Sequence, residues 1–342
     1  MNPSPLVSGE WLAQRLDDEQ IRVVELQYEP DIDEYSEGHI PGAVSWFWKD
    51  LLWHEKNREF PTPTEMAERL GSWGISPETT IVFYSGRNQY AMYAYWVTRS
   101  MNGHRDVRVL DGAQKRWTLD GYPLSTDIPH CSPVDYLPQR DTRDDSSRVF
   151  RDDVLEGLGR NGRLLVDARY GPEYAGERVK PGTGPDHGAE RHGRIPGAVH
   201  LLFRRLFNDD NTLLSPGELE TVFRSVGAAP DQVDEVIAYC RLTHRATSLW
   251  CVASEVLGWS HLRVYDGSWT EWGTAVGLPV ERCAHGTPAP APSDDLGPDP
   301  SGHGPRPEAH PGPGARPRTG GPRDRLAARE LPDQTSQAVQ ER

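Results

Sequence analysis

The chain contains 342 residues, of which 36% are hydrophobic and 26% are charged, and it carries a formal net charge of −14. Its length allows two domains of ordinary size, each with its own core. The acidic balance argues against a general affinity for nucleic acid or anionic lipid, because binding phosphate requires a basic surface.

Short apolar segments alternate with helical patterns along two successive parts of the chain. In the first part we predict a helix at Thr64–Trp73 and strands at Arg22–Leu26, Ala43–Trp46, Thr80–Tyr84 and Val107–Leu110. In the second part we predict strands at Leu164–Ala168, Ala198–Leu202, Glu235–Tyr239 and Arg263–Tyr265. A helix is also predicted there at Pro216–Val226, with Ser215 as its N-cap. Apolar strands separated by amphipathic helices predict an α/β fold with mainly parallel sheets covered on both faces.

The two parts of the chain are copies of one unit. Ile40–Ala43 recurs as Ile195–Ala198, and Trp117 recurs as Trp272, with an offset of 155 residues each time. Solenoid repeats are several times shorter, so this offset indicates duplication of a whole domain.

The composition predicts where the domains begin and end. We place an N-terminal domain at residues 5–127, a linker rich in Pro, Ser and charge at 128–147, and a second domain at 148–283. Residues 284–342 are about one-third Pro plus Gly, too poor in apolar surface to offset the entropy of ordering, and we predict a disordered tail. Such a tail is expected to be dispensable for catalysis.

The sequence shows no recognisable membrane-spanning segment or secretory signal peptide. No run approaches the roughly 18 apolar residues of a membrane span, and the first residues show no basic start followed by an apolar run. We therefore expect a cytoplasmic protein with no membrane segment.

Four cysteines are too few for a disulfide framework in a chain of this length, and no Cys-x-x-Cys pair or His spacing indicates zinc. We predict free thiols, no metal and no cofactor. The four are Cys131, Cys240, Cys251 and Cys283.

Cys240 lies directly after the predicted strand Glu235–Tyr239 and shortly before a helical pattern. Ligands bind at the carboxyl ends of strands in open α/β sheets, and a helix start offers unpaired N–H groups and a partial positive charge. The thiol is also flanked by Arg241, His244 and Arg245. A thiol in these surroundings is expected to have a depressed pKa and to react as the nucleophilic thiolate.

The alternative for any single cysteine is inert packing in a core, which is the commoner case. For Cys240 the three basic neighbours count against it. Cys251 lies inside a helical run of apolar residues and is predicted to be packed in the core. Cys131, in the linker, and Cys283, at the domain end, are predicted to have no chemical role.

The segment Cys240–Arg245 (CRLTHR) is called the cysteine loop below. Together with two further segments, it resembles the tandem-domain rhodaneses, the thiosulfate and 3-mercaptopyruvate sulfurtransferases. Tyr35–Ala43 (YSEGHIPGA) is similar to the first signature of that family, and Val264–Trp272 (VYDGSWTEW) to its C-terminal signature. The resemblance covers roughly residues 5–283. It implies two tandem rhodanese-like, doubly wound domains, of which only the second carries the reactive thiol. By the 155-residue offset Ser85 stands where the second domain has Cys240, so we expect the first domain to be catalytically inactive.

The resemblance also implies a reaction and a set of site residues. Cys240 would take the outer sulfur of thiosulfate as a persulfide, release sulfite, and pass the sulfur to a thiophilic acceptor, cyanide or a thiol. Loop amides and nearby side chains would bind the donor and the persulfide. These predicted binding residues are Asp167, Arg169, Arg241, Thr243, His244, Arg245 and Ala246. For Arg169, a solvated surface position or an ion pair with Glu173 is an open alternative.

The basic loop favours thiosulfate as the donor, since relatives that use 3-mercaptopyruvate carry an uncharged Cys-Gly-Ser-Gly-Val-Thr loop. Arg241 and Arg245 are predicted to bind this compact dianion. Two other hypotheses are a 3-mercaptopyruvate sulfurtransferase and a relay protein that delivers persulfide sulfur to a partner enzyme. A Cys-x5-Arg phosphatase is disfavoured, because four residues separate Cys240 from Arg245. A purely structural protein would not need a basic cysteine loop.

Overall fold

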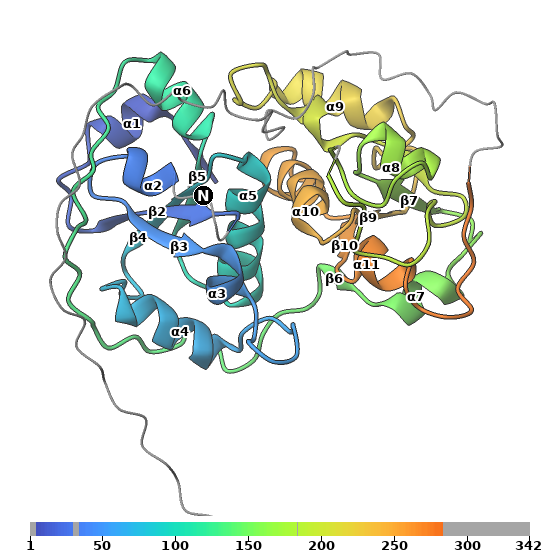
Figure 1. The fold of residues 1–342 in the computed structure, drawn as a ribbon, viewed down its shortest axis with the longest axis horizontal. Coiled ribbons are helices and arrows are strands. Elements are labelled where there is room, and N and C mark those ends of the chain that lie inside the picture. The colour runs from blue at the N-terminus through green and yellow to red at the C-terminus, as the bar shows by residue number, and fades with distance from the viewer. Residues whose placement is uncertain (1–4, 30–33, 183, 283–342) are drawn as a thin grey trace, which may run out of the picture. The chain divides into compact units, whose positions relative to one another are not determined.

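The computed structural model describes residues 5–29, 34–182 and 184–282, which belong to one compact unit. It contains two five-stranded sheets in which all strand pairs are parallel (Figure 1). The predicted fold of two tandem, doubly wound α/β domains with parallel sheets is confirmed. Cys283 and the predicted tail lie outside the described residues.

The first sheet has the strand order β1-β5-β4-β2-β3. Its strands are β1 (Leu6–Val7), β2 (Ile21–Gln27), β3 (Val44–Phe47), β4 (Thr80–Tyr84) and β5 (Val107–Leu110). The helices of this half are α1 (Gly9–Ala13), α2 (Glu34–Glu37), α3 (Trp48–Leu52), α4 (Pro63–Ser72), α5 (Asn88–Tyr95), the π-helix η1 (Trp96–Met101) and α6 (Ala113–Leu119).

The second sheet repeats this arrangement in the order β6-β10-β9-β7-β8. Its strands are β6 (Arg148–Val149), β7 (Arg163–Asp167), β8 (Val199–His200), β9 (Glu235–Tyr239) and β10 (Leu262–Tyr265). The helices are α7 (Arg151–Glu156), α8 (Gly171–Ala175), the 3-10 helix η2 (Phe203–Leu206), α9 (Pro216–Arg224), α10 (His244–Cys251), the π-helix η3 (Val252–Val256) and α11 (Ser268–Trp272).

Neighbouring residues of the central strands serve two different cores, because successive side chains of a strand point to opposite faces. In the first sheet Val24 packs in the cluster that contains α4 and α5, whereas Val23 packs with residues of α1 and α6. In the second sheet Ala238 packs with α9 and α10, whereas Ile237 packs with residues of α7 and α11. Each sheet is thus covered on both faces, which explains the nearly continuous apolar strands of the sequence.

All eight predicted strands overlap observed ones, and the two predicted helices appear as α4 and α9. Ser215 is the N-cap of α9, and its backbone N–H donates to Glu218 Oε2 at 2.9 Å. The strands that the sequence missed are β1 and β6, each of two residues at a sheet edge. The equally short edge strand β8 lies within a longer apolar run, Ala198–Leu202, whereas β1 and β6 have no such run around them. The domain boundaries at 127/128 and 147/148 stay predictions.

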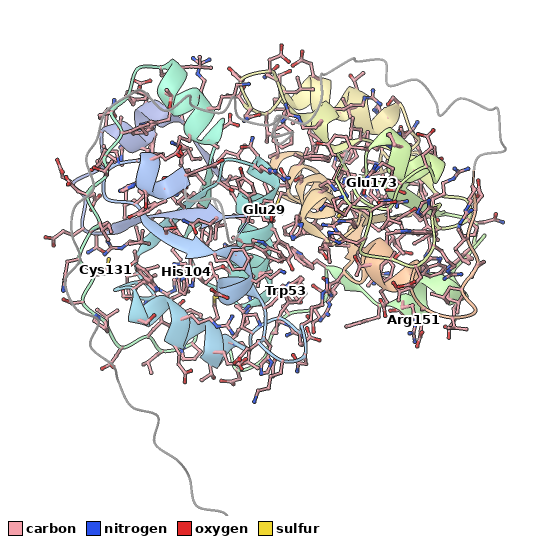
Figure 2. All side chains as sticks on the ribbon, viewed as in Figure 1. Glu29, Trp53, His104, Cys131, Arg151 and Glu173 are labelled. Atoms are coloured by element: carbon pink, nitrogen blue, oxygen red, sulfur yellow. The ribbon has the colours of Figure 1, made fainter. Side chains whose placement is uncertain are left out.

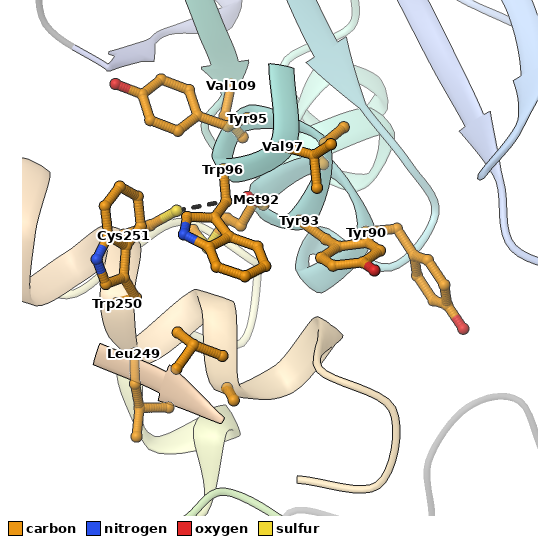
Figure 3. Packing of buried hydrophobic residues seen from close by; sticks show 14 of the residues in the cluster. Tyr90, Met92, Tyr93, Tyr95, Trp96, Val97, Val109, Leu249, Trp250 and Cys251 are labelled. Atoms are coloured by element: carbon orange, nitrogen blue, oxygen red, sulfur yellow. Dashed lines mark hydrogen bonds between the residues drawn. The ribbon is translucent and has the colours of Figure 1, made fainter. Parts of the chain in front are cut away.

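The core that contains α5 is continuous with the one that contains α10. Met92 and Trp96 of the first half and Leu249 and Cys251 of the second belong to one buried cluster (Figure 3). The Cys251 thiol donates to the carbonyl oxygen of Met92 at 3.4 Å, and burial raises its pKa well above the usual value. Cys251 is therefore a packing residue of this interface, in agreement with its predicted role.

Two general properties of the described chain bear on function. Within the described ranges, no helix combines the length and the apolar character needed to cross a membrane. The same residues hold no group of three or more His, Cys, Asp or Glu side chains that could bind a metal ion.

Candidate active site

Cys240 follows the middle strand of the second sheet, β9. Val236, Ala238 and Cys240 alternate along the chain and share the face of the sheet that packs against α10. The side chain of Cys240 is fully buried. This places the thiol at the carboxyl end of the central strand, where parallel sheets bind their ligands.

The backbone around Cys240 is held by the first residues of α11. Its N–H donates to Ser268 Oγ at 3.2 Å, and its carbonyl accepts the N–H of Trp269 at 2.9 Å. The next carbonyl, that of Arg241, accepts both the N–H and the hydroxyl of Thr270, at 3.1 and 2.8 Å. The C-terminal signature segment thus holds the start of the cysteine loop in place through hydrogen bonds to its backbone.

The loop turns sharply at Thr243, which has φ +81° and ψ −43°. The N–H of His244 donates to the carbonyl of Leu242 at 3.1 Å, the hydrogen bond of a γ-turn, and a β-branched residue at positive φ is strained there. The Thr243 hydroxyl lies 2.6 Å from the carbonyl oxygen of Asp266 and 2.8 Å from its Oδ1. Thr243 was predicted to bind substrate, but its hydroxyl is engaged in holding the turn.

The loop offers backbone donors rather than hydroxyl groups. Within the loop and the residue after it, the N–H groups that have no hydrogen-bond acceptor among the described residues are those of Arg241, Leu242, Thr243, Arg245 and Ala246. Unpaired N–H groups at the start of a helix favour bound anions. The loop therefore has free N–H groups that could bind the donor anion and the persulfide, as predicted from the sequence.

Arg245 is buried and forms a bidentate ion pair with Glu173 of α8, with N–O distances of 2.5 and 2.8 Å. Burial by itself lowers the pKa of Arg245, but the carboxylate of Glu173 outweighs it and raises that pKa above the ordinary value. The position of Glu173 is labelled in Figure 2. The positive charge of Arg245, predicted to bind the donor, is thus compensated within the protein.

The ring of His244 packs among three aromatic side chains of the first half, at 4.5, 4.5 and 5.0 Å between centroids. These are Trp48, Tyr90 and Tyr93. Burial lowers the pKa of His244 well below its usual range, and the charges of Arg241 and Arg245 lower it further. His244 is therefore neutral near pH 7, so the cations of the loop are Arg241 and Arg245.

Arg241 remains as the cation of the loop without an acidic partner among the described residues. It is partly exposed. Burial and the nearby charge of Arg245 lower its pKa, although a guanidinium stays protonated in proteins. A Cβ added at Gly188 would lie 2.8 Å from Arg241 Nη1, so the guanidinium rests against this glycine.

Asp167, the last residue of β7, and Arg169 form a buried ion pair. Both side chains are fully buried, and Arg169 Nη2 lies 2.6 Å from Asp167 Oδ2. The guanidinium also donates to the carbonyl of Gly193 at 2.7 Å and lies 4.7 Å from the ring of Trp269. The ion pair of Arg169 is with Asp167, so neither open alternative, a solvated surface position or an ion pair with Glu173, describes it. Its Nη1 has no hydrogen-bond partner among the described residues, and its contact with a donor anion stays a prediction.

Ser85 occupies the corresponding position in the first sheet, directly after β4. It is fully buried, and its hydroxyl donates to the carbonyl of Leu26 at 2.7 Å. This hydroxyl is therefore used internally, and the first half has no thiol at the carboxyl end of its middle strand.

Three residues of the site were not predicted from the sequence. Asp266 and Ser268 lie within the C-terminal signature, which marked the segment but not these contacts. The third is Arg58, which comes from the first half and donates to Asp266 Oδ2 at 2.9 Å. No motif in the sequence surrounds Arg58, so no signal was available to find it.

The sequence matches the rhodanese-like domain family twice, over residues 8–120 and 150–275. The sulfur carrier protein TtuD of Thermus thermophilus is 38% identical over 286 residues, which cover 82% of this chain and 98% of that protein. A protein of Saccharopolyspora erythraea, named "Putative thiosulfate sulfurtransferase", is 37% identical over 278 residues, which cover 81% of this chain and 96% of that protein.

Solved structures with the same architecture include the anaerobic ergothioneine biosynthesis enzyme from Chlorobium limicola in complex with trimethyl histidine. It is 27% identical, with a TM-score of 0.68, and the match covers 81% of this chain and 70% of that one. A structure of EanB that contains a cysteine persulfide and ergothioneine is 26% identical with the same TM-score and the same coverage of both chains.

Proposed function

This chain belongs to the rhodanese family, and from that premise we propose that it transfers the sulfane sulfur of thiosulfate to a thiophilic acceptor through a persulfide on Cys240. The observation that carries the proposal is the surroundings of this thiol. Cys240 follows the middle strand β9 and begins a loop in which several amides and the Arg241 guanidinium have no hydrogen-bond or ion-pair partner among the described residues. This arrangement suits a nucleophile that must exchange sulfur with small anions.

The reaction balances without a cofactor. The thiolate of Cys240 attacks the outer sulfur of thiosulfate, a new S–S bond forms, and the S–S bond of thiosulfate breaks with its electron pair leaving as sulfite. The terminal sulfur of the persulfide is then attacked by an acceptor, cyanide or a thiol. The Cys240 thiolate leaves with the electron pair of the persulfide bond and is regenerated. In both steps the loop amides stabilise the anionic sulfur.

The direct test is to incubate the protein with thiosulfate and to measure its intact mass. A gain of one sulfur atom, mapped to the peptide that contains Cys240, is expected, and cyanide should remove it. If thiosulfate and 3-mercaptopyruvate both leave the mass unchanged, the proposed chemistry is wrong.

A persulfide relay to a partner protein is the second candidate, since one relative at 38% identity is named a sulfur carrier protein. Both candidates use Cys240. They differ in the acceptor: an enzyme for small molecules turns over rapidly with thiosulfate and cyanide, whereas a relay forms the persulfide and turns over slowly until its protein acceptor is added. Turnover with small acceptors, compared with the amount of persulfide formed, separates the two.

The pairing of Arg245 with Glu173 predicts that Glu173 limits the affinity for a dianion. In Glu173→Gln the amide keeps a hydrogen bond to Arg245 but removes the negative charge, so the site gains one uncompensated cation. We expect kcat/KM for thiosulfate to rise about threefold to tenfold, or roughly 0.6–1.4 kcal/mol. The gain should come from a lower KM.

The matched control is Glu220→Gln, which removes one carboxylate from an exposed ion pair with Arg224 on α9. It should leave the kinetics unchanged. Because the substitution also breaks a buried ion pair, Glu173→Gln should unfold at a lower temperature. An unchanged or higher KM for thiosulfate in the folded variant would show that the charge of Arg245 does not reach the donor.

A further inference from the structure

We propose that the first domain, although it lacks the thiol, positions the cysteine loop for sulfur transfer through Arg58. Arg58 reaches across the domain interface to Asp266 and Thr243. It is a positioning residue, since it acts on the loop and not on the reacting sulfur. The inference rests on the proposed function and adds a role for the domain that was expected to be inactive.

The element that requires positioning is the γ-turn at Thr243. Threonine is β-branched and disfavours the left-handed φ of +81° that it adopts here. Such conformations persist only where the surroundings hold them. The Thr243 hydroxyl is held by the carbonyl and the carboxylate of Asp266, at 2.6 and 2.8 Å. The loop amides that would bind the persulfide belong to this same turn, so its shape sets their direction.

Asp266 is itself held by two guanidinium groups. Its side chain is 3% exposed, and a carboxylate so buried requires paired charges. Arg148 Nη2 and Arg58 Nη1 each lie 2.9 Å from Asp266 Oδ2. Arg58 Nη2 adds contacts to the carbonyl of Asp266 at 3.3 Å and to Thr243 Oγ1 at 3.5 Å. Arg58 is therefore the group that touches both partners of the hydrogen bond that holds the turn.

The first domain fixes Arg58 in this place. The guanidinium stacks over the ring of Trp53 at 4.8 Å, and the indole N–H of Trp53 donates to the hydroxyl of Tyr93 at 2.7 Å. The ring of Tyr93 in turn contacts the ring of His244, the residue that follows Thr243. Trp53 is labelled in Figure 2. Two consecutive loop residues are thus held by one connected group of side chains from the first domain.

The test compares Arg58→Ala with the matched control Arg151→Ala. Both arginines line one surface pocket of about 490 Å³, but Arg151 pairs with Asp152 and Glu271 and makes no contact with the loop. For Arg58→Ala we expect kcat for thiosulfate to fall about tenfold, or ~1.4 kcal/mol, with KM changed less than twofold. Arg151→Ala should match wild type. Arg58→Lys, which keeps the charge but loses the fork, should give an intermediate kcat.

A double-mutant cycle tests whether Arg58 acts through the turn. Glycine adopts positive φ without strain and has no hydroxyl to hold, so Thr243→Gly removes the element that Arg58 positions. Thr243→Gly should lower kcat by itself. In the Thr243→Gly background, Arg58→Ala should lower kcat by less than about threefold, instead of the tenfold fall expected in wild type. Full additivity of the two effects would overturn the inference.

The outcomes separate this inference from the function on which it rests. If wild type forms no persulfide, the proposed function is wrong. If wild type transfers sulfur and folded Arg58→Ala does so equally well, the function stands and the positioning role is wrong. Loss of the folded state in both Arg58→Ala and Arg58→Lys would likewise overturn it, because the contact would then serve the stability of the interface.

Discussion

Replacing Cys240 with serine is expected to abolish sulfur transfer, with a fall in turnover on the order of a thousandfold or more, as for the loss of other covalent nucleophiles. A serine hydroxyl stays protonated near pH 7 and forms no counterpart of the persulfide. The fold should survive, because serine fits the buried space of Cys240 and the backbone contacts to Ser268 and Trp269 do not involve the thiol. Turnover with thiosulfate and cyanide, together with intact mass, measures the effect.

The other cysteines supply the controls. Cys131→Ser and Cys283→Ser should leave transfer largely intact. Cys251→Ala should also retain transfer, at a cost in stability of about 1 kcal/mol, because it removes a buried thiol from the contact between α5 and α10. Full activity in Cys240→Ser, or activity that disappears with Cys131 instead, would falsify the assignment of the nucleophile.

The second large effect is expected at Arg241, the loop cation without an acidic partner in the described chain. A charge-assisted hydrogen bond contributes about 1.5–3 kcal/mol. Arg241→Ala should therefore lower kcat/KM for thiosulfate roughly tenfold to a hundredfold, taking each 1.4 kcal/mol as tenfold. Thiosulfate is a compact dianion and 3-mercaptopyruvate carries one carboxylate, so the loss for 3-mercaptopyruvate should be smaller.

The measurement is a pair of specificity constants, one for each donor, in wild type, Arg241→Ala and the exposed control Arg224→Ala. Wild type should prefer thiosulfate, and Arg224→Ala should not differ from it. A strong preference of wild type for 3-mercaptopyruvate, or an equal loss of both donors in Arg241→Ala, would contradict the proposed donor. Cys240 would then keep its role with a different substrate.

Arg245→Ala is expected to behave differently from Arg241→Ala. It leaves the buried carboxylate of Glu173 without its bidentate partner, and breaking a buried ion pair in this way costs about 3–5 kcal/mol of stability. Its kinetic defect will therefore combine with a lower unfolding temperature. Only the comparison of kinetics and unfolding for both variants distinguishes donor binding from structural support.

The sequence by itself determined the features that depend on neighbouring residues. The strands follow from short apolar runs, the duplication from a constant offset, and the position of Cys240 from a strand end followed by a helix start. Each of these is local, because the side-chain periodicity and the strand–loop–helix order are properties of a continuous segment. For the same reason, Ser85 could be identified as the residue that corresponds to Cys240 in the first repeat without a structure.

Only the tertiary structure decided the charges and the contacts of the loop. The sequence shows three basic residues in the loop, but Glu173, 72 positions away, pairs with Arg245, and burial among aromatic rings of the first domain lowers the pKa of His244. Arg58 contacts Thr243 across 185 positions. Electrostatics in a buried site depends on which side chains the folded sheets and the domain interface bring within a few ångströms, and that distance is unrelated to separation along the chain.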